Sequence, residues 1–112
     1  MKRGEIWTVA ASGYASKPRP AVVMQADLFL LTDWVTVCLI TTDPEPAEDL
    51  LRIPIPPSSH NGLREPSMAM VDKLVTVPRA KLGDRTGELE AGPLARLEAA
   101  LIVFLGLSES SS

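Results

Sequence analysis

The sequence predicts a mainly β protein, a small and partly closed antiparallel barrel with short helices and one C-terminal helix. Three observations favour this fold class. Short apolar or alternating segments are separated by turn-rich loops. Ten prolines among 112 residues, about twice the usual share, disfavour an all-helical bundle. Only one long segment, near the C-terminus, has helical periodicity. The length suits a single domain, expected over residues 1–107, followed by a serine-rich tail over 108–112 that is expected to be disordered.

Seven segments have the alternating or β-branched pattern of strands. They are 5–10, 21–24, 35–40, 51–55, 67–71, 74–77 and 85–89. The segment 35–40 is apolar on both faces, so we expect it in the middle of the sheet. Pro54 cannot donate a ladder hydrogen bond, so the segment around it is expected at an edge.

Three segments predict helical structure. Residues 26–31 suit one or two turns, and residues 78–82 suit a single turn between a proline and a glycine. The long helix is expected over 93–105, beginning at Pro93 and ending before Gly106.

The long helix has one broad apolar face. Its apolar residues recur at three- and four-residue steps, and two more widen the face beyond what one small sheet needs. The recurring residues are Leu94, Leu97, Leu101 and Phe104, and the widening residues are Ile102 and Leu105. Two interpretations remain open, core packing alone or core packing together with a dimer contact.

Composition excludes several classes of protein. The formal net charge of -3 disfavours a generic basic nucleic-acid binder. Basic residues gather in 1–25 and 51–85, and these two segments would form one positive surface if they fold together. Cys38 is the one cysteine, no His/Cys cluster has zinc spacing, and no phosphate-binding glycine motif occurs. The N-terminus lacks a signal-peptide pattern, and no apolar run approaches the length of a membrane span. We therefore expect a cytoplasmic protein without metal or cofactor.

Polar residues at strand ends are the candidates for chemistry. Arg19 stands between two prolines that restrict its backbone, and Thr41 and Thr42 follow the most apolar strand. Asp72 interrupts two apolar segments, where a charge is unusual unless it is paired or functional. Together they suggest an anion site. His60, the only histidine, is expected to be a solvated turn residue, because its neighbours favour turns.

Several short motifs, in order along nearly the whole chain, resemble those of the MazF/PemK family of toxin endoribonucleases. They are Lys2-Arg3-Gly4-Glu5-Ile6-Trp7, Lys17-Pro18-Arg19-Pro20-Ala21-Val22-Val23, Leu39-Ile40-Thr41-Thr42, Asn61-Gly62-Leu63, Val71-Asp72-Lys73 and Arg79-Ala80-Lys81-Leu82-Gly83. The resemblance implies an SH3-like barrel of the CcdB/Kid/MazF toxin type that works as a symmetric homodimer. It implies metal-independent, sequence-specific cleavage of single-stranded RNA through attack by the 2′-hydroxyl, and neutralisation by an antitoxin with a flexible acidic tail.

The resemblance also assigns site residues. Arg19 and Thr41 match the family's catalytic pair, and Asp72 matches an aspartate implicated as a base. Substrate contacts are expected from Tyr14, Lys17, Thr42 and Lys73, with Tyr14 stacking on a base and Lys17 contacting a phosphate. A plain solvent-exposed role for Tyr14 and Lys17 is equally compatible with the sequence. The chain departs from the family where Met70 replaces the arginine that some members place two residues before the aspartate.

Two other functions remain compatible with the same fold. A CcdB-type toxin that binds DNA gyrase would not need Arg19 and Thr41 together. The second alternative is an inactive barrel that serves as a binding or regulatory module.

Overall fold

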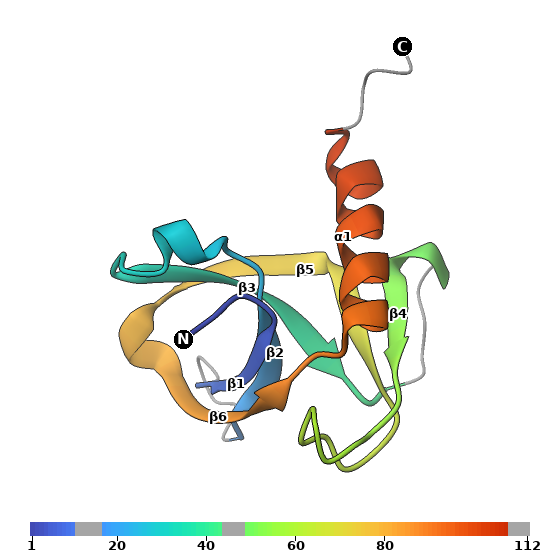
Figure 1. The fold of residues 1–112 in the computed structure, drawn as a ribbon, viewed down its shortest axis with the longest axis horizontal. Helices are drawn as coiled ribbons and strands as arrows, with labels where there is room; N and C mark the ends of the chain where they lie inside the picture. Colours follow the sequence, from blue (N-terminus) through green and yellow to red (C-terminus); the bar gives the residue numbers. More distant parts are fainter. Residues whose placement is uncertain (11–16, 44–48, 108–112) are drawn as a thin grey trace.

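The computed structural model describes residues 1–10, 17–43 and 49–107. It contains one antiparallel sheet with strand order β4-β5-β3-β2-β1-β6, strongly curled, and one long helix beside it (Figure 1). The strands are β1 Glu5–Val9, β2 Arg19–Val23, β3 Trp34–Thr41, β4 Arg52–Ile55, β5 Ser67–Pro78 and β6 Leu82–Glu88. The helix is α1 Ala91–Leu105, and three short 3-10 turns are η1 Asp27–Phe29, η2 Asp49–Leu51 and η3 Arg79–Lys81. The predicted mainly β class with one C-terminal helix is confirmed.

The strand order agrees with the sequence prediction for β3 and β4. β3 lies between β2 and β5, and its residues from Val35 to Ile40 are buried or half-buried. β4 is at an edge of the sheet, where the exposed Pro54, which has no N–H to donate, is tolerated. β2 begins at Arg19, earlier than predicted, because the sheet pairs this residue with Val9 of β1.

The prediction of two strands on either side of Asp72 was wrong, because β5 is continuous from Ser67 to Pro78. Its pairing with β3 shifts register between Cys38 and Ile40. An irregularity of this kind absorbs extra residues without ending the strand, and it changes which side chains face which side. Asp72 lies in this irregular stretch and is half-buried.

The register shift lets one strand contribute to two hydrophobic cores. Ala69 and Val71 pack in the core beside α1, whereas Val75 and Val77 pack in the second core, on the opposite face of β2 and β3. In β2, successive side chains point to opposite faces of the sheet, so Val22 belongs to the first core and its two neighbours belong to the second.

Local structure around the last strand and α1 differs from the prediction at the boundaries. The predicted turn over 78–82 is the shorter η3, and β6 begins directly after it instead of at residue 85. α1 begins at Ala91, before Pro93, which is tolerated because the first four helical N–H groups have no partner within the helix. Gly106 ends the helix as predicted, with a φ of 70° that favours glycine.

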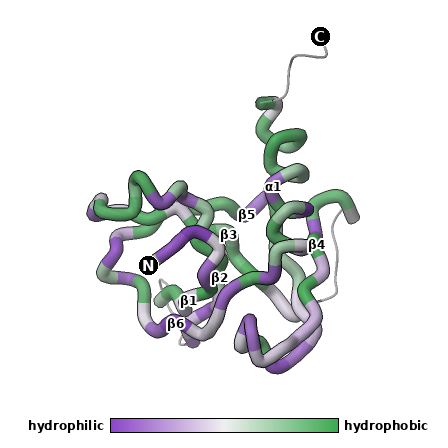
Figure 2. The backbone as a smooth tube through the Cα atoms, in the orientation of Figure 1, coloured by the Kyte–Doolittle hydropathy of each residue, from purple (hydrophilic) through white to green (hydrophobic). Residues whose placement is uncertain are grey.

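The apolar face of α1 is only partly buried. Leu97 and Leu101 are in the core, Leu94 is half-buried, and Phe104 is 47% exposed. The distal half of α1 extends beyond the sheet and is strongly hydrophobic in Figure 2. The exposed apolar residues of this end are Ile102, Val103, Phe104, Leu105 and Leu107. The broad face predicted from the sequence therefore exists, and the sheet does not cover its distal end.

Candidate functional site

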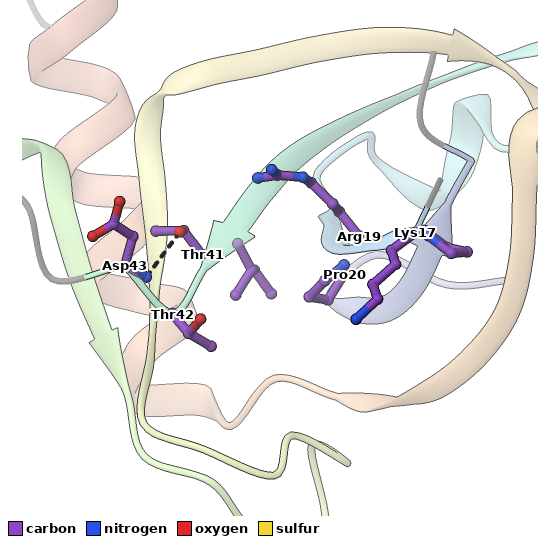
Figure 3. A pocket seen from close by; sticks show the side chains of 8 residues that line it. Lys17, Arg19, Pro20, Thr41, Thr42 and Asp43 are labelled. Carbon is purple, nitrogen blue, oxygen red and sulfur yellow. Dashed lines mark hydrogen bonds between the residues drawn. The ribbon is translucent and has the colours of Figure 1, made fainter. Parts of the chain in front are cut away.

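A pocket of about 520 Å³ opens where β2 begins and β3 ends. We call it the strand-end pocket. Its lining residues are Lys17, Pro18, Arg19, Pro20, Ile40, Thr41, Thr42 and Asp43. Figure 3 shows these side chains around the opening, with Arg19 contributed by β2 and Thr41 by β3. The structure thus brings together four of the seven predicted site residues.

Strand register explains why Arg19 and Thr41 meet. β2 and β3 pair Ala21 with Leu39, and the same antiparallel register, continued by two residues, places Arg19 opposite Thr41. Directly opposite residues of adjacent antiparallel strands project from the same face of the sheet. Two residues that are 22 positions apart in the sequence therefore form one site through a single strand pair.

Arg19 has a fixed backbone and an accessible side chain. Its backbone pairs with Val9 in the β1–β2 ladder, and it stands between two prolines. The side chain is exposed and extends toward Thr41, whereas the side chain of Lys17 diverges from it (Figure 3). Within the described ranges, neither side chain makes a hydrogen bond or an ion pair with another part of the chain. The guanidinium is thus available to a ligand in a defined place.

Thr41 is half-buried at the end of β3. Its Oγ1 accepts a hydrogen bond of 3.0 Å from the backbone N–H of Asp43, which orients the hydroxyl (Figure 3). A hydroxyl that accepts such a bond still has its own O–H to donate. Thr42 is exposed, and the Asp43 side chain lies beside Thr41 at the other side of the pocket from Arg19. The pocket therefore offers one guanidinium and hydroxyl donors to an anion.

Asp72 does not line the strand-end pocket. It lies in β5, where its Oδ1 accepts a hydrogen bond of 2.7 Å from Arg52 Nη1 in an ion pair. Burial raises the pKa of the Asp72 carboxyl, but the hydrogen bond and charge of Arg52 and the charge of Lys73 outweigh burial and hold that pKa below its usual value. Lys73 is exposed beside it. The role of Asp72 as a base stays a prediction, and Tyr14 lies outside the described residues.

Arg52 is a residue that the sequence reasoning missed. It stands in an alternating edge strand, where a charged side chain usually faces solvent, and nothing in the local pattern relates it to Asp72. The contact depends on the pairing of β4 with β5, which places Arg52 opposite Met70. Only a long-range pairing prediction could have found it.

His60 occupies an exposed turn, as predicted. The turn is held against β6 by backbone and side-chain bonds rather than by the imidazole. The N–H of Glu88 donates to the carbonyl of His60, and the buried Asn61 donates to Glu90 from its side chain at 3.1 Å. This loop is a structural connection between β4 and β5.

Within the described residues, no helix is long and apolar enough to cross a membrane. The same part of the chain contains no group of three or more His, Cys, Asp or Glu side chains gathered as metal ligands. Burial and the charge of Asp72 raise the pKa of the Cys38 thiol to about 12, so this buried thiol is protonated at neutral pH.

The fold and the strand-end pocket define a class of protein, a small curled β-sheet protein with a C-terminal helix and an arginine–threonine site suited to an anion. Comparison with known proteins identifies the family. Residues 2–105 match the model of the "PemK-like, MazF-like toxin of type II toxin-antitoxin system" family, and the chain belongs to this family.

Individual relatives agree with this assignment. The chain is 46% identical over 109 residues to a protein of Mycolicibacterium smegmatis named "Probable endoribonuclease MazF", covering 96% of this chain and 99% of the relative. The Mycobacterium tuberculosis toxin MazF-mt6 has 25% identity and a TM-score of 0.76, covering 91% of this chain and 96% of that structure. An endoribonuclease in complex with its cognate antitoxin, from a mycobacterial species, has a TM-score of 0.79 at 22% identity, with 96% of each chain covered. The barrel fold expected for this toxin type is thereby confirmed.

Proposed function

We propose that this protein is the toxin of a type II toxin–antitoxin system, and that it cleaves single-stranded RNA at specific sequences without a metal ion. The observation that carries the proposal is the strand-end pocket, which Arg19 lines from the start of β2 and Thr41 from the end of β3. The relative with 46% identity, named a probable endoribonuclease, supports the reaction class.

The reaction proposed is transesterification within the RNA chain. The 2′-hydroxyl loses its proton, and its oxygen forms a bond to the adjacent phosphorus. The bond from phosphorus to the 5′-oxygen breaks, and that oxygen takes up a proton. The products are a 2′,3′-cyclic phosphate and a 5′-hydroxyl. The pentacoordinate transition state carries more negative charge on its oxygens than the starting diester.

Arg19 and Thr41 suit that transition state. A guanidinium presents two parallel N–H donors to phosphate oxygens, and its charge does not depend on pH in the physiological range. Because the backbone of Arg19 is fixed by β-pairing and flanking prolines, little reorganisation is needed when charge develops. The Thr41 hydroxyl donates a further hydrogen bond without adding charge.

For the proton transfers, Asp72 is proposed as the base, following the family resemblance. Its lowered pKa keeps the carboxylate ionised at neutral pH but also makes it a weak base, and it lies outside the strand-end pocket. Lys17 and Thr42, at the pocket, and Lys73, beside Asp72, are proposed to contact the RNA strand, and Tyr14 to stack on a base.

We also propose that the protein is cytoplasmic, forms a homodimer and is neutralised by an antitoxin with an acidic flexible tail. The distal end of α1 supports the dimer, since its apolar residues border a largely apolar groove of about 400 Å³. Residues lining this groove include Met24, Leu74, Ile102, Leu105 and Leu107. Two-fold pairing is the commonest way for a small chain to cover such a face. Sedimentation as a monomer at micromolar concentration would contradict the dimer.

The test of the proposed function is incubation of the purified protein with labelled single-stranded RNA in EDTA. We expect cleavage that EDTA does not affect, with 5′-hydroxyl ends that a polynucleotide kinase labels without prior phosphatase treatment. The Arg19→Ala variant should yield no such product. Absence of cleavage together with inhibition of DNA gyrase would favour the CcdB-type alternative. Absence of both activities would favour an inactive binding module.

A further inference from the structure

The register of three strands places Arg52 on the same sheet face as the strand-end pocket. β5 pairs Met68 with Thr41 of β3 on one side and with Pro54 of β4 on the other. Arg52, two residues from Pro54, is paired with Met70. Paired residues share a face, and so do residues two apart along a strand. Thr41 and Arg52 therefore project from one face of the β3–β5–β4 part of the sheet.

The helix covers the other face of these strands. Ile40, Ala69 and Ile53 pair across β3, β5 and β4, and all three are buried in the core beside α1. An extended ligand bound at the strand-end pocket can therefore continue toward Arg52 without meeting α1.

The separation between the two sites suits neighbouring nucleotides. Arg52 lies two strands and two residues from Thr41. With about 4.8 Å between strands and about 3.3 Å per residue, their backbone positions are roughly 12 Å apart. Long side chains shorten the gap between their end groups. Arg19, in β2, lies one strand further from Arg52 than Thr41 does, so two neighbouring phosphates of one RNA strand can bind the two arginines.

Arg52 is held in place before any ligand binds. Its Nη1 donates to the Leu51 carbonyl at 2.9 Å and to Asp72 at 2.7 Å. The Arg52 side chain is only 12% exposed. Across the described part of the chain, its hydrogen bonds use Nη1 alone, so Nε and Nη2 retain donors for an anion. With Lys73 next to Asp72, the three charged groups sum to +1.

We propose that Arg52, positioned by Asp72, binds a phosphate of the RNA strand adjacent to the one cleaved at Arg19 and Thr41. The inference rests on the proposed RNA cleavage and adds a substrate contact to the site, without changing the role proposed for Asp72. Fixing Arg52 in advance reduces the side-chain entropy that is lost when the strand binds. Arg52 thus contributes to the alignment of the substrate rather than to the chemical step.

The first test is the salt dependence of RNA binding. The probe is a fluorescent single-stranded oligonucleotide that the wild-type protein cuts, with a 2′-deoxynucleotide at the cut so that the attacking hydroxyl is missing. For Arg52→Gln, we expect about tenfold weaker binding at low salt. We also expect the slope of log K against log salt to become shallower by about 0.7, because one phosphate contact is lost. Arg96→Gln, which removes an exposed arginine of α1, is the matched control and should change neither quantity.

The second test locates the phosphate. Each linkage of the same oligonucleotide is replaced in turn by an uncharged methylphosphonate. Replacement at several linkages should weaken binding to the wild-type protein. Binding to Arg52→Gln should be insensitive to replacement at one of these linkages, other than the scissile one. If Arg52 only stabilised the fold, Arg52→Gln would weaken binding in general and would not abolish the effect of replacing one particular linkage. Arg52→Lys, which keeps the charge, should retain the wild-type salt slope.

The outcomes separate the two proposals. A wild-type protein that cleaves no RNA overturns the proposed function and this inference with it. Wild-type cleavage together with an unchanged slope and linkage pattern in a folded Arg52→Gln protein overturns this inference alone. If Arg52→Gln does not fold, Arg52→Met, which keeps the apolar part of the side chain, takes its place in both tests, with the same expected and contradicting results.

Discussion

Glu5 offers a quantitative test of how this fold is stabilised. It is only 6% exposed at the start of β1. Its Oε1 accepts hydrogen bonds of 3.0 Å from the Lys2 backbone N–H and from Trp7 Nε1, and its Oε2 lies 3.0 Å from Arg85 Nε in an ion pair. Burial raises the pKa of the Glu5 carboxyl, but the bonds from Trp7, Lys2 and Arg85 outweigh burial and lower that pKa to about 2.

The shift in pKa converts to a contribution to stability. The pKa falls from 4.5 to about 2, a difference of about 2.5 units. At 1.36 kcal/mol per unit, the ionised carboxylate stabilises the folded protein by about 3 kcal/mol. Because the folded pKa is the lower one, this stability is fully present above about pH 4.5. It is lost as the pH falls toward 2.

Glu5→Gln removes the charge and leaves an amide facing the arginine donor. We expect the free energy of unfolding at pH 7 to fall by about 2–3 kcal/mol. The melting temperature should fall by about 10 °C for a chain of this size. Urea denaturation followed by circular dichroism, at one fixed protein concentration, measures the difference between the two proteins. That difference should shrink as the pH is lowered from 5 to 2.

Glu88→Gln is the matched control. Glu88 is also paired with Arg85, but at 3.9 Å and with a side chain that is 35% exposed. Its substitution should change the free energy of unfolding by less than about 0.5 kcal/mol at every pH. The reasoning would be refuted if Glu5→Gln destabilised the protein equally at pH 7 and pH 2.5. Equal effects of the two substitutions at pH 7 would refute it as well.

Three further predictions concern the site and the loop after β4. Arg19→Ala should reduce the RNA cleavage rate by about 10²–10³ or more, as for loss of one preorganised donor, and Thr41→Ala should act in the same direction less severely. Gel filtration and antitoxin binding should stay near wild type in both variants, and wild-type cleavage by Arg19→Ala would exclude the assigned site. His60→Ala should keep nearly full activity, and its pH–rate profile should have the same shape as that of the wild-type protein, measured on one RNA. Gly62→Ala should lower the urea midpoint, because Gly62 has a φ of 74° and an added Cβ would meet the backbone oxygen of Thr86. An unchanged midpoint would show that the loop accommodates the methyl group.

Local sequence patterns were sufficient to predict much of the fold. The β-branched segment around Cys38 predicted a central strand, and Pro54 predicted an edge strand, because a missing N–H is tolerated only there. Gly106 marked the end of α1 because few other residues adopt its left-handed conformation without strain. The motif resemblance predicted the family, and it paired Arg19 with Thr41, which strand register then brought into one pocket.

Properties that depend on strand register and burial could be determined only from the tertiary structure. Nothing in the alternating pattern of residues 5–10 indicates that Glu5 is buried, yet two hydrogen-bond donors and an ion pair hold its carboxylate in a buried position. The charge of Asp72 led to the wrong prediction of two separate strands. The ion pair with Arg52 of β4, which lets Asp72 lie within one continuous strand, is not visible in the local sequence. The periodicity of α1 gave the width of its apolar face but not the point at which the sheet stops covering it. Each of these features arises between residues far apart in the chain, where a one-residue change of register would exchange the buried and the exposed side chains.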